Sequence, residues 1–500
     1  MSPIHRNIKN RESWVSAVDY FVLLWIVTIS RWVYRSHSLY HLDSIDYALG
    51  IEYFSPVVHQ PHPPGSYLYV KLAQLVHNVL PDSNDTLVAI SIAASCAAAA
   101  LTYRLAHVWF GRAAARWSGI LFVLSPLFWF HGTVAMIYIV EAAMSALFAY
   151  LCWLTWCGRH AMIIPAVIVL GLTVGIRQSA VLFLAPLLLL VLRRVSWRQA
   201  LVAVVVCAFT VGAWFMPMLT ESGGYVVYFT ALNDVLVRVT DPSLPHNILK
   251  NGALLLLTYA LCFGVVAPLL FVRSLPIQMP SGGWMFIIIW LTPGLLFFLH
   301  TFGPLTLGHA LFLCIPLAAI LGAKIAALPI VKKSGKGRLF LIMTMAAIHI
   351  ALFLYVPFYI SQSRIAQHEH DIVQIEQAIR VIAKPENSLV IGVDAHFYGY
   401  RHLGYSLPEY QVLSFPELRF SQGMGVFSMQ NRRSKILSRI PIEQYKEFVF
   451  YFPDSRDIKI YQELFPKLRS ESIKTINING HAFLMGPTSA LSKIFQNTAH

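Results

Sequence analysis

The segment HLDSIDYALGIEYFSPVVHQPHPPG, residues 41–65, directly follows the first long apolar run of the chain. It carries paired aspartates, a glutamate, three histidines and several prolines. Charged groups at a membrane boundary are costly unless they are hydrated, paired or used. The segment therefore indicates a membrane protein with a polar site just beyond its first helix.

The overall composition is that of a polytopic membrane protein. Of the 500 residues, 57% are hydrophobic and only 12% are charged, and the mean hydropathy is +0.60. A soluble domain usually has about 25% charged residues. The net charge of +14 comes from basic residues in short loops between apolar runs, as the positive-inside rule expects. We therefore expect no nucleic-acid partner.

About eleven apolar runs are long enough, or nearly long enough, to cross a bilayer as helices. They cover residues 18–36, 86–106, 115–131, 134–156, 161–176, 178–193, 199–219, 250–272, 284–300, 308–328 and 339–359. The expected fold class is thus an α-helical membrane protein with about eleven transmembrane helices.

Basic residues predict the orientation of these helices. Arg6, Lys9 and Arg11 precede the first run, and further basic residues recur in alternate loops, which should be cytoplasmic. An odd number of spans then places the 37–85 loop and the C-terminal region outside the cytoplasm. We expect the membrane to be a bacterial plasma membrane.

The chain becomes more polar after residue 360 and shows mixed helix and strand patterns. Helical spacing of apolar residues covers 363–383 and 457–468, and apolar β-type runs cover 388–393, 447–452, 472–478 and 481–486. We therefore expect two domains. Residues 1–360 form a transmembrane domain with a first outer loop at 37–85, and residues 361–500 form a small extracytoplasmic α/β domain.

Asp43 and Asp46 are three residues apart, so a helix would place both on one face, with Tyr47 on the same side. Such a pair suits a catalytic base with a helper, or a divalent-metal site, which Glu141 could complete. A solvated loop turn is the alternative. No cofactor is required by the pattern.

His62 lies between prolines in QPHPPG, where the chain cannot be helical except at a helix start. We expect a rigid entry into an amphipathic helix, with His62 near the aspartates. The apolar stripe of that helix comprises Leu68, Leu72, Leu75 and Val79.

Two further polar groups interrupt apolar runs. Glu141 lies within a run, with Tyr138 three residues before it, and a membrane-embedded acid is a candidate functional residue. Arg177 and Gln178 lie between two runs. A guanidinium there, or that of Arg31 near the end of the first run, could clamp a lipid phosphate. A packing hydrogen bond for Glu141 and snorkelling for the arginines are the alternatives.

Four of these segments together resemble the GT-C superfamily of polytopic glycosyltransferases, nearest to its protein O-mannosyltransferase and aminoarabinose-transferase branch. The segments are LDSIDYALG (42–50), HPPGSYLY (62–69), YIVEA (138–142) and GLTVGIRQS (171–179), in that order. The resemblance covers roughly residues 15–190, and implies that 1–360 is a GT-C-like catalytic domain.

The resemblance also implies roles for individual residues. Asp43 matches the catalytic acid of the family's first outer loop, and Glu141 matches an acid of the second. Arg177 stands near a Lys or Arg that is common there. His62 stands where aminoarabinose-type relatives have Lys before the proline pair, and Asp46 replaces a basic residue of some relatives.

The expected function is transfer of a sugar, with inversion, from a polyprenyl-phosphate donor to a hydroxyl of an acceptor lipid, glycan or protein. Asp43 would be the base, assisted by Asp46 and Glu141. The donor phosphate would meet Arg177, His62 and Arg31, while Tyr47, Tyr138 and Gln178 would contact substrate. A lipid or solute transporter and a non-catalytic membrane scaffold are the alternatives.

Overall fold

The computed structural model describes residues 17–239, 248–275, 277–300, 307–415, 426–437 and 442–495. They form two compact units. The first, or helical unit, comprises the described residues of 1–36 and 66–365, and the second, or sheet unit, comprises those of 37–65 and 366–500. Residues 37–65 pack with the C-terminal residues, so these units divide the chain differently from the expected 1–360 and 361–500 domains.

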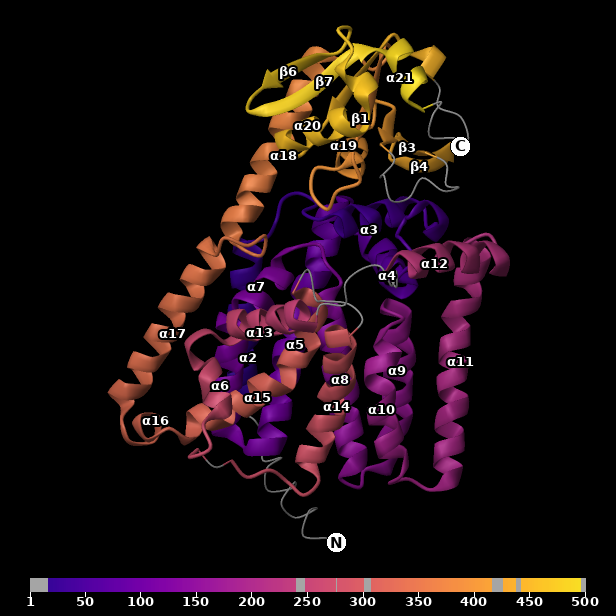
Figure 1. Cartoon of the computed structure of the whole chain (residues 1–500). Coiled ribbons are helices and arrows are strands. Elements are labelled where there is room, and N and C mark those ends of the chain that lie inside the picture. The colour runs from indigo at the N-terminus through magenta and orange to yellow at the C-terminus, as the bar shows by residue number, and fades with distance from the viewer. Residues whose placement is uncertain are drawn as a thin grey trace. The chain divides into compact units, whose positions relative to one another are not determined.

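The helical unit is built from helices of different lengths, most of them apolar (Figure 1). They are α2 (Ala17–Val33), α4 (Tyr67–His77), α5 (Ser83–Phe110), α6 (Arg112–Leu124), α7 (Pro126–Thr133), α8 (Tyr138–Trp156), α9 (Ile163–Ile176), α10 (Ala180–Leu192), α11 (Trp197–Glu221), α12 (Tyr225–Val239), α13 (Ile248–Phe263), α14 (Gly283–His300), α15 (Leu311–Ala327), α16 (Pro329–Lys333) and α17 (Gly335–Tyr355), with 3-10 turns at η2 (His160–Met162), η3 (Gly264–Phe271) and η4 (Gly308–Ala310).

All eleven expected runs fall on helices, which confirms a multi-pass membrane protein. Within the described residues, seven helices are long and apolar enough to span a membrane, or eight if α6 and α7, bent by 57°, form one span. Three runs form shorter apolar helices: α2 with 17 residues, α9 with 14 and α10 with 13. The count of eleven spans stays a prediction.

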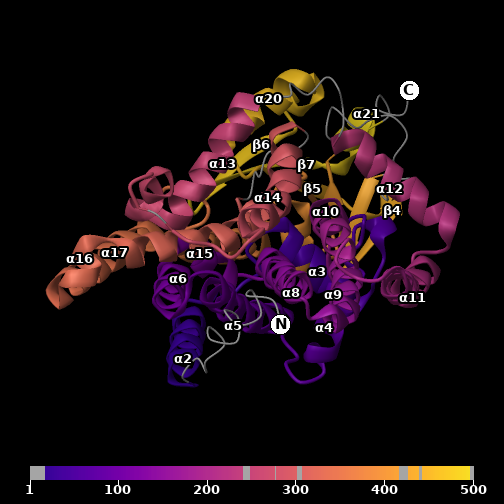
Figure 2. The same cartoon turned by 90° about the horizontal axis from the view of Figure 1, so that it is seen from below.

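Close helix contacts hold the centre of the helical unit together. Figure 2 shows α5, α6 and α15 grouped there. The Ser118 hydroxyl of α6 donates to the Ala318 carbonyl of α15 at 3.1 Å. Gly322 faces the same contact, and a Cβ there would collide with Ser118 and the Ala114 backbone. A small residue is therefore needed for α15 to approach α6 so closely.

The expected amphipathic segment after the prolines is confirmed as α4, which begins directly after Ser66. Leu72 and Leu75 on its outer face are exposed, as is Val79 just beyond its end. Leu68, at the start of the stripe, is partly buried near Gly175.

The sheet unit is built on a mixed seven-stranded sheet in the order β4-β3-β2-β1-β5-β7-β6. Central β1 is parallel to β2 and β5, and the other pairs are antiparallel. The strands are β1 (Ser388–Gly392), β2 (Val412–Ser414), β3 (Val426–Gln430), β4 (Arg433–Leu437), β5 (Glu447–Tyr451), β6 (Lys474–Ile478) and β7 (His481–Pro487). Its helices are α3 (Leu42–Glu52), α18 (Gln362–Ile382, which starts in the helical unit), α19 (Tyr400–Ser406), α20 (Ser455–Leu464) and α21 (Thr488–Phe495), with 3-10 turns η1 (Pro56–Val58), η5 (Ile442–Gln444) and η6 (Pro466–Arg469).

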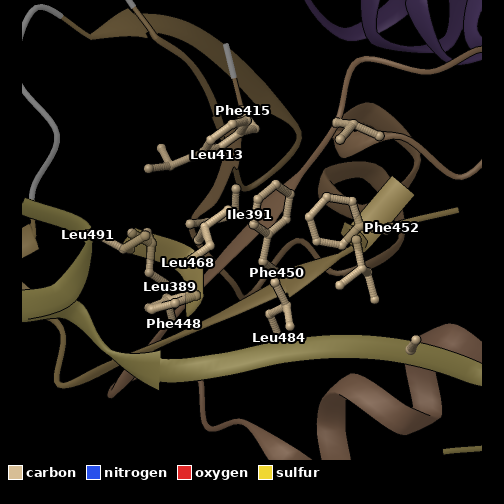
Figure 3. Packing of buried hydrophobic residues seen from close by; sticks show 13 residues of the cluster. Leu389, Ile391, Leu413, Phe415, Phe448, Phe450, Phe452, Leu468, Leu484 and Leu491 are labelled. Atoms are coloured by element: carbon tan, nitrogen blue, oxygen red, sulfur yellow. The ribbon is translucent and has the colours of Figure 1, made fainter. Parts of the chain in front are cut away.

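Helices cover both faces of this sheet. Alternate strand residues point to opposite sides, and those of the central strands are buried on both. Phe448 and Phe450 of β5 point into a core with Leu491 of α21 (Figure 3). Ile458 of α20 belongs to the same core. The intervening Val449 and Tyr451 join the opposite core under α18 and α19.

The expected strands over 388–393 and 447–452, the final strand pair, and the helices over 363–383 and 457–468 are all confirmed. The helix expected over 457–468, α20, ends at Leu464 because Pro466 follows. The extracytoplasmic location of this unit stays a prediction.

Candidate functional site

Asp43 and Asp46 lie in the first turns of α3, as the spacing predicted. The helix begins there because His41 caps it. Nδ1 of His41 accepts a hydrogen bond from the Asp43 backbone N–H at 3.1 Å, and the Ser44 hydroxyl accepts one from the His41 backbone N–H at 3.3 Å. The Asp43 side chain is 19% exposed, whereas that of Asp46 is only 2% exposed. Asp43 is thus the carboxylate that an incoming molecule can reach.

His62 lies beside both aspartates, which confirms the expected proximity. Its Nδ1 is 3.3 Å from Oδ2 of Asp46 and 3.9 Å from Oδ1 of Asp43. The loop can fold back onto α3 because Gly50 has no side chain, and a Cβ there would press on Pro61 and the Gln60 carbonyl. The Gln60–Pro61 and Pro63–Pro64 peptide bonds are both cis.

Arg401 completes this group and was not expected from the sequence. Its Nη1 donates to Oδ1 of Asp46 at 2.6 Å and to the His59 carbonyl at 2.9 Å. The side chain is buried, and its guanidinium carbon lies 5.2 Å from the Tyr400 ring centre. We call Asp43, Asp46, His62 and Arg401 the aspartate cluster.

The charges of the aspartate cluster are closely balanced. Burial acts to lower the pKa of His62, but the hydrogen bond to Asp46 and the negative charges of both aspartates outweigh it, so that its pKa is raised. Burial lowers the pKa of His41, despite the nearby Asp43. Burial also opposes the charge of Arg401, but Asp46 holds the pKa of this guanidinium above its usual range. The two acids therefore face the cation Arg401 and an easily protonated His62.

Tyr47, expected to contact substrate, is buried within the sheet unit with 3% of its surface exposed. That burial favours a packing role. Its assignment to substrate binding stays a prediction.

A divalent metal fits this cluster poorly. Ligand atoms of Asp43, Asp46 and His62 lie within 4.8 Å of one another, and within the described residues these are the only such group. However, Asp46 already has Arg401 on one oxygen and His62 on the other. The guanidinium supplies the positive charge that a metal would bring. That Glu141 completes a metal site stays a prediction.

Glu141 and Arg177 form a buried ion pair within the helical unit. Nη1 of Arg177, which follows α9, donates to Oε2 of Glu141 at 2.5 Å. The Glu141 side chain is 2% exposed, and its Oε1 has no hydrogen-bond partner among the described residues. The Tyr138 ring lies 5.3 Å from the Arg177 guanidinium carbon, and its hydroxyl is 3.4 Å from Nε2 of His309. Three expected site residues therefore meet here.

The other two expected site residues of the helical unit, Gln178 and Arg31, make different contacts. Gln178 is partly buried, and its amide nitrogen is 3.9 Å from the Met218 sulfur. Arg31 is fully buried and donates to the Val123 carbonyl at 3.1 Å and the Phe122 carbonyl at 3.4 Å. These carbonyls belong to the last turn of α6, where backbone acceptors lack helical partners. The contacts favour a capping role for Arg31.

Two solved structures have a fold similar to that of this chain. The crystal structure of ArnT from Cupriavidus metallidurans bound to undecaprenyl phosphate matches with a TM-score of 0.57 and 13% identity, over 95% of this chain and 98% of that one. Its apo state matches with a TM-score of 0.51, the same identity and the same coverage. This chain has the GT-C glycosyltransferase fold. No protein-family model and no curated protein matches its sequence.

The GT-C fold confirms what the four short motifs implied about architecture. At 13% identity the likeness concerns the fold, and the roles of individual residues must be argued from this chain's own contacts.

Proposed function

We propose that this protein is a membrane glycosyltransferase that moves a sugar from a polyprenyl-phosphate donor to a hydroxyl of an acceptor lipid, glycan or protein, on the extracytoplasmic face. The observation that carries the proposal is the position of Asp43. It is a reachable carboxylate beside the buried ion pair of Asp46 and Arg401 and the partly exposed His62. The GT-C fold, together with the undecaprenyl phosphate bound to ArnT, supports the donor class.

The proposed reaction is a single displacement with inversion. Asp43 accepts the proton of the acceptor hydroxyl while that oxygen bonds to the anomeric carbon. The bond between the anomeric carbon and the phosphate oxygen breaks, and its electron pair leaves with the polyprenyl phosphate. Phosphate is already a good leaving group, so no strong general acid is needed.

Asp46 supports Asp43 without reaching the acceptor itself. Its side chain is buried and engaged by Arg401 and His62, and it holds His62 beside Asp43. A protonated His62 beside Asp43 can also donate to an anionic or hydroxyl group of the substrate.

Arg177 is the guanidinium that we propose for the donor phosphate. A guanidinium can bind phosphate through several N–H groups at once. Glu141 neutralises it, and Tyr138 covers its face. Arg31 is left out of the proposed phosphate site because its donors already serve backbone carbonyls.

The experiment offers the purified protein a panel of radiolabelled polyprenyl-phosphate sugars together with hydroxyl acceptors. Wild type should release lipid phosphate from at least one donor, and Asp43→Asn should not. The matched control is Asp454→Asn, an exposed acid of the same unit that caps α20, since asparagine caps helices equally well. Release that is independent of Asp43 would reject the proposed base. Absence of release from every donor would favour a transporter or scaffold.

A further inference from the structure

Arg401 connects the first loop of the chain to its C-terminal α/β part. It belongs to α19, whereas its two hydrogen-bond acceptors lie 355 and 342 residues earlier in the sequence. One acceptor is Asp46 on α3 and the other is the carbonyl of His59 in the following loop. A single guanidinium nitrogen thus ties together the two pieces of backbone that carry Asp43 and His62.

The position of His62 depends on that tie. The loop from α3 to His62 closes through a bridge between Ser55 and Gln60, and His59 within it has a left-handed φ of 58°. Its carbonyl is held by Arg401, three residues before His62. Loss of that hydrogen bond removes one of the restraints on the distance from His62 to the aspartates of α3.

The fold explains why an arginine of α19 reaches this place. Strand β1 leads to β2 on one side of the sheet, whereas β5 lies on its other side, so that the chain reverses its course beside β1. Open α/β sheets bind their ligands outside the carboxyl ends of strands at such a point. Here the loop after β1 contacts the start of α3: the His396 carbonyl accepts the Leu42 amide at 3.0 Å, and the His41 and His396 rings stack at 5.3 Å.

The buried ion pair is also electrically necessary. Asp46 and Arg401 are each 2% exposed, and removal of one partner leaves an uncompensated charge away from water. Without Arg401, His62 would be the nearest remaining cation of the aspartate cluster, and Asp46 would draw it away from Asp43.

We propose that Arg401 is a positioning residue for the proposed transfer reaction: its hydrogen bonds to Asp46 and the His59 carbonyl fix His62 beside Asp43, so that the catalytic loop depends on the C-terminal α/β part. The proposal rests on the proposed function for its kinetic consequence alone. Its structural consequence, an ordered segment 41–65, holds whatever the substrate is.

The test compares Arg401→Gln, Arg401→Lys, Asp46→Asn and the double variant Asp46→Asn/Arg401→Gln in the full-length protein. Arg380→Gln is the matched control, since Arg380 forms an exposed ion pair with Glu409 at 3.0 Å in the same unit. Hydrogen exchange of residues 41–65 is measured first. Arg401→Gln should speed exchange there, Arg401→Lys should speed it less, and Arg380→Gln should leave it unchanged.

Lipid-phosphate release is measured next on the same proteins. A misplacement of about 1 Å can cost about 100-fold in rate, so kcat of Arg401→Gln should fall by about 10- to 100-fold while KM for the donor stays within about threefold. Arg401→Lys should recover part of kcat. The double variant should be no slower than Arg401→Gln, because both changes act through one contact.

Two results would overturn the inference. One is that Arg401→Gln leaves the hydrogen exchange of residues 41–65 unchanged. The other is that the fold-loss of kcat in the double variant equals the product of the losses in Arg401→Gln and Asp46→Asn. If Arg401→Gln does not fold, Arg401→Lys and Asp46→Asn carry both readouts. Faster exchange in a protein whose wild type releases no lipid phosphate would uphold the positioning role and reject the proposed function instead.

Discussion

Arg401 and Asp46 form a buried ion pair at 2.6 Å, although 355 residues separate them in the sequence. The pair leaves Asp43, at 19% exposure, as the more reachable of the two aspartates of α3. Two aspartates that look equivalent in the motif LDSIDYALG therefore have different surroundings. From this difference we propose Asp43 for proton transfer and Asp46 for its support.

Metal removal should have little effect on turnover. Arg401 already compensates Asp46, and the leaving phosphate needs no strong acid. EDTA should therefore change the rate of lipid-phosphate release by less than about twofold, whereas loss of a catalytic Lewis acid would cost several kcal/mol of transition-state stabilisation. A loss of activity with EDTA that Mg²⁺ or Mn²⁺ restores would show that the cluster holds a metal after all.

Separation of the Glu141–Arg177 pair should be costly. Removal of one partner of a buried ion pair typically costs about 3–5 kcal/mol. Arg177→Met should therefore lower the thermal unfolding temperature in detergent, and Arg177→Met/Glu141→Gln should recover part of the loss. Both variants should raise KM for the donor if Arg177 binds its phosphate.

The matched control for that pair is Lys71→Met. Lys71 forms an ion pair with Glu221 at 2.8 Å, with side chains 33% and 38% exposed. Exposed pairs contribute about 0–1 kcal/mol, so this variant should unfold close to the wild-type temperature. An equal fall in unfolding temperature for Arg177→Met and Lys71→Met would contradict the distinction between a buried and an exposed ion pair.

Arg31 should matter for stability and not for donor binding. Arg31→Leu leaves two carbonyls at the end of α6 without their donor, which should cost about 1–3 kcal/mol. Thermal unfolding and donor KM are measured beside Arg35→Leu, whose guanidinium lies partly exposed over Trp32. A tenfold higher KM with normal stability would return Arg31 to the phosphate site.

The sheet unit should lose stability in mild acid. Burial lowers the pKa of His368 to about 4 from its ordinary 6.5, and it acts in the same direction on the neighbouring His402 and on His41. Between these pH values the unfolded chain binds a proton that the folded unit does not. Stability therefore falls as pH drops from about 6.5 to about 4, by roughly 3 kcal/mol for His368.

Hydrogen exchange of the buried strands β1 and β5, corrected for the intrinsic effect of pH, measures this loss. His368→Gln should flatten the dependence on pH, whereas His370→Gln, an exposed neighbour on α18, should keep it. Identical profiles for both variants would show that another group controls the acid response.

The sequence predicts much of this fold because hydrophobicity is a local signal. Every apolar run became a helix, and the buried runs at 388–393 and 447–452 became the central strands. Strand β2, with three residues, and α19, with seven, are too short to show a period, so they were missed. The two-residue turn between β3 and β4 uses Asn431 and Arg432, both with positive φ, and its asparagine was a signal that could have been used.

The candidate site was only partly predictable, for a different reason. Residues in one motif share a helix, so the proximity of Asp43 and Asp46 follows from spacing. Glu141 and Arg177 each stood out as charges among apolar residues, but their pairing depends on how α8 packs with α9. Arg401 lies in a polar region where an arginine is ordinary, and only tertiary structure brings it to Asp46.

The central claim is that Asp43 is the base of the transfer reaction, and turnover and donor binding measured on one Asp43→Asn preparation test it most directly. General-base catalysis typically contributes about 100- to 10,000-fold. We expect release of lipid phosphate to fall by at least about 100-fold while the donor still binds with near wild-type affinity. Turnover within about tenfold of wild type, with the donor bound normally, would contradict the assignment of Asp43 as the base.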